Sequence, residues 1–472
     1  MNTDDQTPFD LDIDPWRPVF HVAPPAGLLN DPNGLVFWQG RHHVFFQWNP
    51  KGCTHENKSW GHRVSADLVH WETMPIALEP SEWYETHGCY SGSAVVDGDD
   101  LVLIYTGNVR DAEGRRETRQ CLARSRDGKQ FSKLGSVIDG PLPGYTTHFR
   151  DPKVTRVGDG WRMVLGAQTD GLQGTVLLLA STDPARWEAV TELLEAGEHG
   201  YMCECPDLFR LDGEDVLLVC EQRETKPGKG SGNVAGWIAG RLDPASLAFD
   251  HGAFRRLDHG RDFYAPQTWE APDGRRLMLA WMGLPEQDDA PTVAHGWFHC
   301  LTLPRELRLV DGRLLQSPAV ELEALRGPAR RVRAPIVSGE RDFPELVGET
   351  YELAVALDPR ETADLAFDLR VAGEEATSVE IDRAGGVVRL TTRDREGTTV
   401  ALGEAPLDGP VDLLRVFVDR SSIEVFVGDG RIVLSARIYP SPGATGVRAR
   451  SIGGAVVAGI TFWPLAPRPT AE

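Results

Sequence analysis

The chain has 472 residues, of which 41% are hydrophobic and 25% are charged, a composition typical of folded globular domains. Its 49 Lys and Arg residues against 70 Asp and Glu residues leave a formal net charge of −21, which argues against nucleic acid as a partner. No apolar run is long enough to span a membrane and the N-terminus is acidic, so we expect neither a membrane segment nor a secretory signal. The seven cysteines show no paired metal spacing, which indicates free thiols in a reducing cytoplasm.

In chain order, we interpret residues 1–20 as an N-terminal extension and residues 21–326 as the part that carries the chemistry. All 13 His, all 7 Cys and 12 of the 13 Trp occur by residue 300. A short helix is expected over 319–325, and the Pro- and Arg-containing stretch that follows predicts a linker over 327–340. Beyond it, alternating apolar and polar residues at 415–418 and 423–427 predict strands with one buried face.

The first part of the chain contains an internal repeat of about 60 residues. A short polar motif recurs at five places, each followed some ten residues later by an apolar strand, and its reference positions lie 60, 60, 54 and 60 residues apart. These positions are Pro32, Gly92, Pro152, Pro206 and Pro266. A second marker, an Asp followed four residues later by an aromatic residue, occurs as Asp67 with Trp71, Asp127 with Phe131 and Asp183 with Trp187.

Five strand-rich copies predict an all-β fold, a five-bladed β-propeller over residues 21–326 in which each copy supplies one blade. Coincidental spacing of turns is the alternative. Because equivalent positions of successive blades converge on the axis of a propeller, we expect one residue from each blade to face a common funnel. These residues are Asp31, Ser91, Asp151, Glu204 and Tyr264.

Three carboxylates at one polar funnel are the groups that cleavage of a glycosidic bond requires. A retaining glycosidase uses one carboxylate as nucleophile and a second, protonated carboxyl as acid, and crowding of like charges raises one of the two pKa values. Tryptophans supply flat surfaces for a sugar ring, and the candidates are Trp48, Trp60, Trp83, Trp281 and Trp297.

Several motifs together resemble glycoside hydrolase family 32, whose members include invertases, sucrose-6-phosphate hydrolases, inulinases and levanases. The three that carry the resemblance are Asn30-Asp31-Pro32-Asn33-Gly34, Phe149-Arg150-Asp151-Pro152 and Glu204-Cys205-Pro206-Asp207. Supporting segments occur in the same order from residue 21 to about residue 465, and they include residues 46–50, 59–62, 90–93, 262–267 and 417–426.

The resemblance implies a five-bladed propeller followed by a β-sandwich, which we place at residues 341–472. It also implies a β-fructofuranosidase in which Asp31 is the nucleophile, Glu204 the acid and base, and Asp151 a stabiliser of the transition state. Further residues match positions that line the fructose subsite or accompany it, and no metal or organic cofactor is implied. These residues are Asn30, Gln47, Trp60, Ser91, Arg150, Tyr264 and Trp281.

Two positions depart from the family pattern. Leu28 and Cys203 stand where many members carry Trp, and the second departure puts the preference for the leaving group in doubt. Sucrose is the expected substrate, with an exo-fructanase, a sucrose-6-phosphate hydrolase or a transfructosylating enzyme as alternatives. A sugar-binding propeller without activity is the alternative from another class, and a homodimer formed by this chain also stays open.

Other clusters have structural explanations beside functional ones. Asp31 could be a turn residue, and Asp151 could serve only as a partner of Arg150. The histidines at 42, 43, 55 and 62 fit no compact ligand set for a metal. Six arginines between residues 110 and 126 are typical of a solvated strand surface, with a patch that recognises the phosphate of sucrose 6-phosphate as the alternative. They are Arg110, Arg115, Arg116, Arg119, Arg124 and Arg126.

Overall fold

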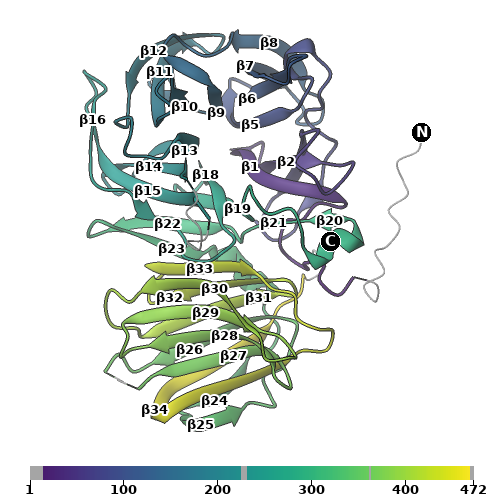
Figure 1. The fold of residues 1–472 in the computed structure, drawn as a ribbon, viewed down its shortest axis with the longest axis vertical. Coiled ribbons are helices and arrows are strands. Elements are labelled where there is room, and N and C mark those ends of the chain that lie inside the picture. The colour runs from purple at the N-terminus through teal and green to yellow at the C-terminus, as the bar shows by residue number, and fades with distance from the viewer. Residues whose placement is uncertain (1–13, 225–230, 361–362, 468–472) are drawn as a thin grey trace.

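The computed structural model describes residues 14–224, 231–360 and 363–467, and nearly all of its regular structure is strand (Figure 1). Five separate sheets form an upper body and a further set of packed sheets forms a lower one. The described residues contain three short 3-10 helices and no α-helix. These helices are η1 (Trp83–Glu85), η2 (Pro291–His295) and η3 (Val320–Leu325). The prediction of an all-β propeller followed by a β-sandwich is confirmed.

The upper body is a ring of five blades whose first strands contact one another in sequence around the channel. Blade 1 has β1 (Gly27–Trp38), β2 (Arg41–Asn49), β3 (Ser59–Ser65) and β4 (Glu72–Thr73). Blade 2 has β5 (Cys89–Asp97), β6 (Asp100–Arg110), β7 (Arg116–Ser125) and β8 (Ser132–Ile138). Blade 3 has β9 (Tyr145–Val157), β10 (Gly160–Thr169), β11 (Gly174–Asp183) and β12 (Arg186–Glu192).

The last two blades are less regular, because short strands pair with their outer parts. Blade 4 has β13 (Met202–Leu211), β14 (Glu214–Gln222), β15 (Asn233–Leu242), β16 (Phe249–His251) and β17 (Arg255–Arg256). Blade 5 has β18 (Tyr264–Glu270), β19 (Arg276–Met282), β21 (Cys300–Leu301), β22 (Arg305–Val310) and β23 (Arg313–Pro318). In sequence, β20 (Trp297–Phe298) lies between β19 and β21, but it pairs in parallel with β1 of blade 1. This pairing joins the end of the propeller to its beginning.

The strands inside the blades are apolar on both faces because each blade is covered by its neighbours. In β14, Leu217 packs in the cluster shared with blade 3, whereas Leu218 packs in the cluster shared with blade 5. A continuous apolar run such as 216–219 is therefore read as a strand buried on both sides. This packing holds the inner strands at fixed positions around the channel.

The inner strand of every blade contains a β-bulge at the repeated polar motif. Its pairing with the next strand shifts between residues 29 and 32, 89 and 92, 150 and 153, 204 and 207, and 264 and 267. A bulge inserts an extra residue and re-aims a side chain, so consecutive side chains of one strand are able to reach the channel. Asp31, Ser91 and Asp151 lie inside these shifted stretches, whereas Glu204 and Tyr264 are the last paired residues before theirs.

The lower body is a β-sandwich whose two sheets share one very long strand, β34 (Gly446–Pro464). The first half of β34 pairs with β27 and the second half with β26. One sheet continues through β27 (Leu365–Ala372), β28 (Glu375–Asp382), β29 (Val387–Arg393) and β30 (Thr399–Pro406). The other continues through β26 (Thr350–Leu357), β31 (Leu413–Asp419), β32 (Ser422–Val427) and β33 (Ile432–Arg437).

The stretch 327–340, expected to be a linker, contributes strands to the sandwich. β24 (Arg330–Arg333) and β25 (Ile336–Asp342) both pair with β34. The linker interpretation is therefore wrong for most of this stretch, because a polar, arginine-rich sequence can still form an edge strand through backbone hydrogen bonds. The short helix expected just before it is the 3-10 helix η3.

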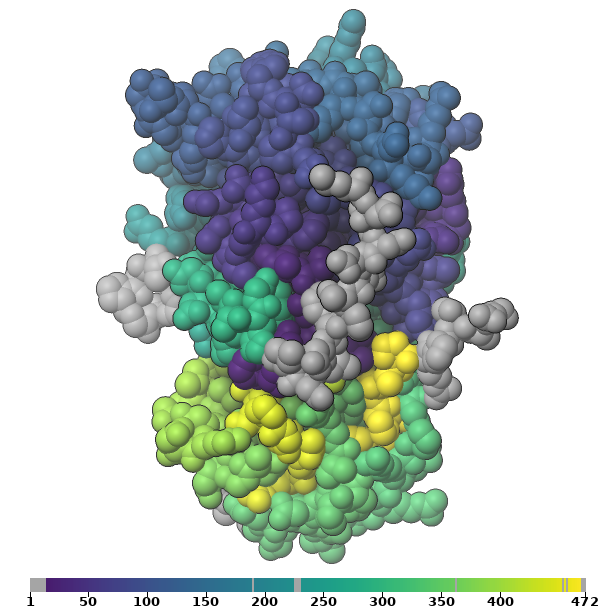
Figure 2. Space-filling view, turned by 90° about the vertical axis from the view of Figure 1, so that its right-hand side faces the viewer, coloured from purple at the N-terminus to yellow at the C-terminus, as the bar shows by residue number. Residues whose placement is uncertain are grey.

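The N-terminal segment ties the two bodies together. Residues 1–13 of the expected extension lie outside the described part, but residues 14–21 pack against both bodies. The Trp297 indole donates to Asp14 at 2.7 Å, and the backbone N–H groups of Val19, Phe20 and His21 all donate to the Asp419 carboxylate. Figure 2 shows purple residues from the start of the propeller and teal-green residues from its end beside the green and yellow residues of the sandwich, with most of the blue residues at the far end.

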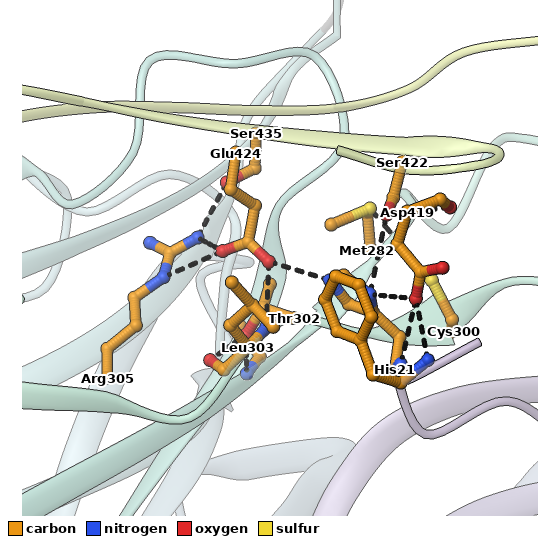
Figure 3. Close-up of polar contacts among 12 residues, drawn as sticks. His21, Met282, Cys300, Thr302, Leu303, Arg305, Asp419, Ser422, Glu424 and Ser435 are labelled. Atoms are coloured by element: carbon orange, nitrogen blue, oxygen red, sulfur yellow. Dashed lines mark hydrogen bonds and ion pairs between the residues drawn. The ribbon is translucent and has the colours of Figure 1, made fainter. Parts of the chain in front are cut away.

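A buried ionic network lies at this interface (Figure 3). His21 contacts Asp419 at 2.8 Å and Glu424 at 3.0 Å, and Glu424 also accepts two hydrogen bonds from Arg305. Arg305 in turn reaches Asp258 at 3.0 Å. Because each of these charged groups has a partner of opposite charge, the ion pairs offset the cost of burying them away from water.

Candidate active site

Asp31 lies in the bulge of β1 and its carboxylate is held by side chains from three strands. Oδ2 accepts hydrogen bonds from Gln47 Nε2 at 3.0 Å and from Ser91 Oγ at 2.5 Å, while Oδ1 accepts one from Asn30 Nδ2 at 3.0 Å. Gln47 is on β2 of the same blade and Ser91 is in the bulge of β5. Oδ1 therefore has fewer partners than Oδ2 and is the freer oxygen.

Glu204 lies in β13 and receives donors from the two neighbouring blades. Arg150 donates to Oε1 through Nε at 3.1 Å and through Nη2 at 2.7 Å, and the Tyr264 hydroxyl donates to Oε2 at 2.7 Å. Arg150 and Tyr264 lie in the inner strands β9 and β18. The carboxyl group is thus fixed on both oxygens between blades 3 and 5.

Asp151 lies between the surroundings of Asp31 and those of Glu204. Its Oδ2 accepts a hydrogen bond from the backbone N–H of Cys205 at 3.1 Å and lies 3.9 Å from Arg150 Nε. The Cys205 thiol contacts both the Asp31 carboxylate, at 3.6 Å, and the Asp151 carboxylate, at 3.7 Å. Three acids that are far apart in the sequence therefore meet in one cluster at the channel.

Burial and mutual repulsion shape the protonation of these acids. Burial raises the pKa of Asp31, the hydrogen bond from Ser91 opposes that rise, and the charge of Glu204 adds to it. Burial raises the pKa of Asp151 to about 7, against the effect of Arg150 and with the help of the charges on Glu204 and Asp31. Such crowding favours a state in which one acid of the cluster holds a proton near neutral pH.

Two of the predicted aromatic residues are buried in the walls of the site. Trp60 is 0% exposed and its indole donates to the Tyr90 carbonyl at 3.0 Å. Trp281 is 1% exposed and meets the Tyr264 ring edge-on, with 6.3 Å between ring centroids. Of the other candidate surfaces, Trp83 is 63% exposed and lies under Arg119, while Trp297 is buried against the N-terminal segment.

The structure adds residues that sequence reasoning missed. Lys58 is buried, donates to Asn30 Oδ1 at 2.5 Å, and has its pKa lowered to about 7 by burial. Thr106 accepts a hydrogen bond from the Asp151 backbone, and His148 Nδ1 lies 3.0 Å from Arg150 Nη1. The signal available for Lys58 was its position two residues before Trp60, directly before the start of β3.

The departure at Cys203 does not open the wall beside Glu204. Cys203 is fully buried in the cluster between blades 3 and 4, with Val176 and Leu217 among its neighbours. Its side chain fills the packing between blades, while the neighbouring Glu204 faces the channel. Leu28 is likewise fully buried, on the strand that closes the propeller.

Within the described ranges, no cluster of three or more His, Cys, Asp or Glu side chains is arranged to hold a metal ion. None of the helices in those ranges has the length and hydropathy needed to cross a membrane.

A propeller that gathers carboxylates, an arginine and a tyrosine in one funnel belongs to the β-propeller glycosidases. The family follows from comparison with known proteins. The family model for the glycosyl hydrolases family 32 N-terminal domain matches residues 21–318, and the model for the family's C-terminal domain matches residues 321–464. The chain belongs to glycosyl hydrolase family 32.

Individual relatives agree with this assignment. The chain is 43% identical to the sucrose-6-phosphate hydrolase of Bacillus subtilis (strain 168), covering 93% of this chain and 92% of that protein. It is 44% identical to the sucrose-6-phosphate hydrolase of Klebsiella pneumoniae, covering 90% and 89%. Among solved structures, a Bombyx mori GH32 beta-fructofuranosidase is 33% identical with a TM-score of 0.83, covering 96% of this chain and 95% of that one.

Proposed function

We propose that this protein is a retaining β-fructofuranosidase that releases fructose from sucrose or a closely related fructoside through a covalent fructosyl-enzyme intermediate. The observation that carries the proposal is the single cluster formed by Asp31, Asp151 and Glu204. The names of the relatives, which are sucrose-6-phosphate hydrolases and a beta-fructofuranosidase, support the same substrate class.

In the first step, Asp31 attacks the anomeric carbon of the fructosyl unit and the bond from that carbon to the leaving oxygen breaks. Oδ1 is the attacking oxygen in this proposal, because Oδ2 already accepts hydrogen bonds from Gln47 and Ser91. Glu204 gives its proton to the leaving oxygen. The displaced sugar departs with that proton, and the fructosyl unit stays bound to Asp31 as an ester.

In the second step, Glu204 takes a proton from water while the water oxygen attacks the same anomeric carbon. The ester bond to Asp31 breaks, fructose leaves, and both carboxyl groups return to their first state. Asp151 and Arg150 bind fructose hydroxyls in this proposal, and the negative charge of Asp151 stabilises the oxocarbenium-like transition state. Tyr264 holds the Glu204 oxygen that points toward blade 5.

The test is hydrolysis of sucrose by the purified protein, with free fructose and glucose measured. Asp31→Asn and Glu204→Gln are each expected to lower kcat by about 10³-fold or more, since each removes a bond-forming or proton-transferring group. Glu72→Gln is the control, because its side chain is 60% exposed and pairs with Arg41 on the neighbouring strand. Near-normal turnover in a folded Asp31→Asn variant would overturn the assigned role.

Retention is tested separately by adding methanol as a competing acceptor. A covalent intermediate formed and broken on opposite faces gives methyl β-fructofuranoside, whereas direct displacement gives the α-anomer. Formation of the α-anomer would contradict the two-step route while leaving a hydrolase in place.

A further inference from the structure

Lys58 is a buried cation in the wall of the active site, and its hydrogen-bond partners are uncharged groups. The residue directly precedes β3 and is only 3% exposed. Its Nζ donates to Asn30 Oδ1 at 2.5 Å and contacts His55 Nδ1 at 3.3 Å. Among the described residues, this ammonium forms no ion pair with a carboxylate. A cation buried without a direct counter-ion is costly to the fold, so its presence here requires a reason.

The carboxylate that acts on this cation is that of Asp31, on the other side of Asn30. Burial lowers the pKa of Lys58 to about 7, and the charge of Asp31 opposes that fall. The same interaction lowers the pKa of Asp31, against the effects of burial and of the charge of Glu204. Lys58 and Asp31 therefore stabilise each other's charged forms without touching.

Asn30 connects the two charges and has a fixed orientation. Its Oδ1 accepts the hydrogen bond from Lys58, and its Nδ2 donates to Asp31 Oδ1 at 3.0 Å. An ammonium group can only donate hydrogen bonds, so Lys58 determines that the amide oxygen faces it and that the amide nitrogen faces Asp31. If the amide were turned by half a rotation, two acceptor oxygens would face each other beside the nucleophile.

The backbone of Lys58 is held by blade 2. Its carbonyl accepts a hydrogen bond at 2.8 Å from the N–H of Cys89, the first residue of β5. Gly88 passes so close to the lysine stem that a Cβ at this position would lie 3.2 Å from the Lys58 Cβ, and its φ of +129° also favours glycine. Because both the backbone and the stem are fixed, the ammonium has a defined position beside Asn30.

The other rings near the ammonium are neutral in this arrangement. A ring nitrogen that contacts an ammonium must be the unprotonated one, so His55 accepts through Nδ1. His299 is 1% exposed, and burial together with nearby positive charges, Lys58 among them, holds its pKa well below 6.5. Trp281 meets the His55 ring edge-on, with 5.6 Å between ring centroids. None of these groups can replace Asp31 as the counter-ion of Lys58.

We propose that Lys58 is a positioning residue for the nucleophile: through Asn30 it orients the attacking oxygen of Asp31, and its charge stabilises the Asp31 carboxylate. This inference rests on the proposed function, in which Asp31 Oδ1 forms the bond to the anomeric carbon. In the second step of that reaction, the electron pair of the ester bond returns to Asp31 as water attacks. A fixed cation on the far side of Asn30 favours this return.

The test compares kcat and kcat/KM for sucrose in the wild type and in Lys58→Met at pH 6, 7 and 8. Met is an unbranched apolar side chain that fills irregular buried space and needs no counter-ion, so the variant is expected to fold. Loss of one charge-assisted contact should lower kcat/KM at pH 6 by about 10- to 100-fold, and kcat should fall with it.

The pH dependence separates a charge effect from simple packing. The charged or titratable groups left around Asp31 in the variant are Glu204, Asp151 and the Cys205 thiol. None of them is a cation, so the pKa of Asp31 rises and the acidic limb of kcat/KM moves to higher pH. The wild type itself loses the Lys58 charge as the pH rises through about 7. The wild-type advantage should therefore shrink from pH 6 to pH 8, whereas a lysine that only fills space gives a constant ratio.

Lys58→Arg is the second variant, because its guanidinium stays charged over this pH range. Its kcat/KM should decline less than that of the wild type between pH 6 and pH 8, and an equal decline would overturn the role of the charge. The role of the amide is tested by making Lys58→Met in an Asn30→Ala background. The loss there should be smaller than in the wild-type background, since the group that transmits the effect is absent.

Lys51→Met is the matched control, because Lys51 is an exposed lysine in the same turn between β2 and β3. It should leave kcat and kcat/KM at their wild-type values. Unchanged kcat/KM in a folded Lys58→Met variant would overturn the proposal, as would a loss that is the same at every pH. Release of no fructose from sucrose by the wild type would instead refute the proposed function, and this inference with it.

Discussion

Replacing His21 by Gln is expected to remove much of the alkaline sensitivity of the folded protein. His21 is fully buried between the propeller and the sandwich, with Asp419 on one ring nitrogen and Glu424 on the other (Figure 3). Burial by itself lowers the pKa of this ring, but the hydrogen bonds and charges of the two carboxylates more than compensate and raise it to about 9. The imidazolium is therefore the form that the interface requires.

The magnitude follows from the difference between folded and unfolded pKa values. A rise from 6.5 to about 9 corresponds to about 3 kcal/mol of stability at 1.36 kcal/mol per pKa unit. Because the folded pKa is the higher one, this contribution is fully present below pH 6.5 and is lost as the pH rises through 9. Gln is neutral at every pH. The variant therefore lacks this stabilisation at neutral pH, and its stability does not fall for this reason as the pH rises.

The assay is denaturant unfolding at pH 6.5, 8 and 9.5 for the wild type and for His21→Gln. Taking the difference between the two proteins cancels the titration of other groups in this range, such as Asp151 and Lys58. The wild type should lose about 3 kcal/mol more than the variant across the range. His251→Gln, which alters a histidine at the edge of blade 4, should behave like the wild type. Equal pH slopes for wild type and His21→Gln would refute the reasoning.

Two further substitutions test the interface and the site. Arg305→Met removes the buried cation that the carboxylates of Glu424 and Asp258 share and should cost about 3–5 kcal/mol in urea unfolding. Arg41→Met, at a pair whose side chains are 50% and 60% exposed, should cost at most about 1 kcal/mol. Equal losses of stability in Arg305→Met and Arg41→Met would contradict the importance of the buried ion pairs. Tyr264→Phe removes the 2.7 Å donor to Glu204 and should lower kcat by about 10- to 100-fold, measured as release of fructose; unchanged turnover would exclude a role for this hydroxyl.

The order of the motifs and the spacing of the repeat predicted the fold because a propeller is built from local units. Each copy of about 60 residues forms its own sheet through neighbouring strands, so the period is visible along the chain. The same spacing indicated that Asp31, Asp151 and Glu204 converge, since inner strands of successive blades lie side by side. Where the pattern was weak, as in 327–340, the sequence suggested a linker, whereas long-range pairing with β34 makes strands of it.

What only the tertiary structure decided is how side chains from different blades share partners. The sequence alone identified the three acids, the five-fold repeat and the cluster of six arginines. It did not show that Lys58 donates to Asn30, or that Glu204 and Tyr264 directly precede the bulges of their strands. Those facts depend on contacts across blades and on local shifts of strand register, and neither leaves a periodic signal in the chain.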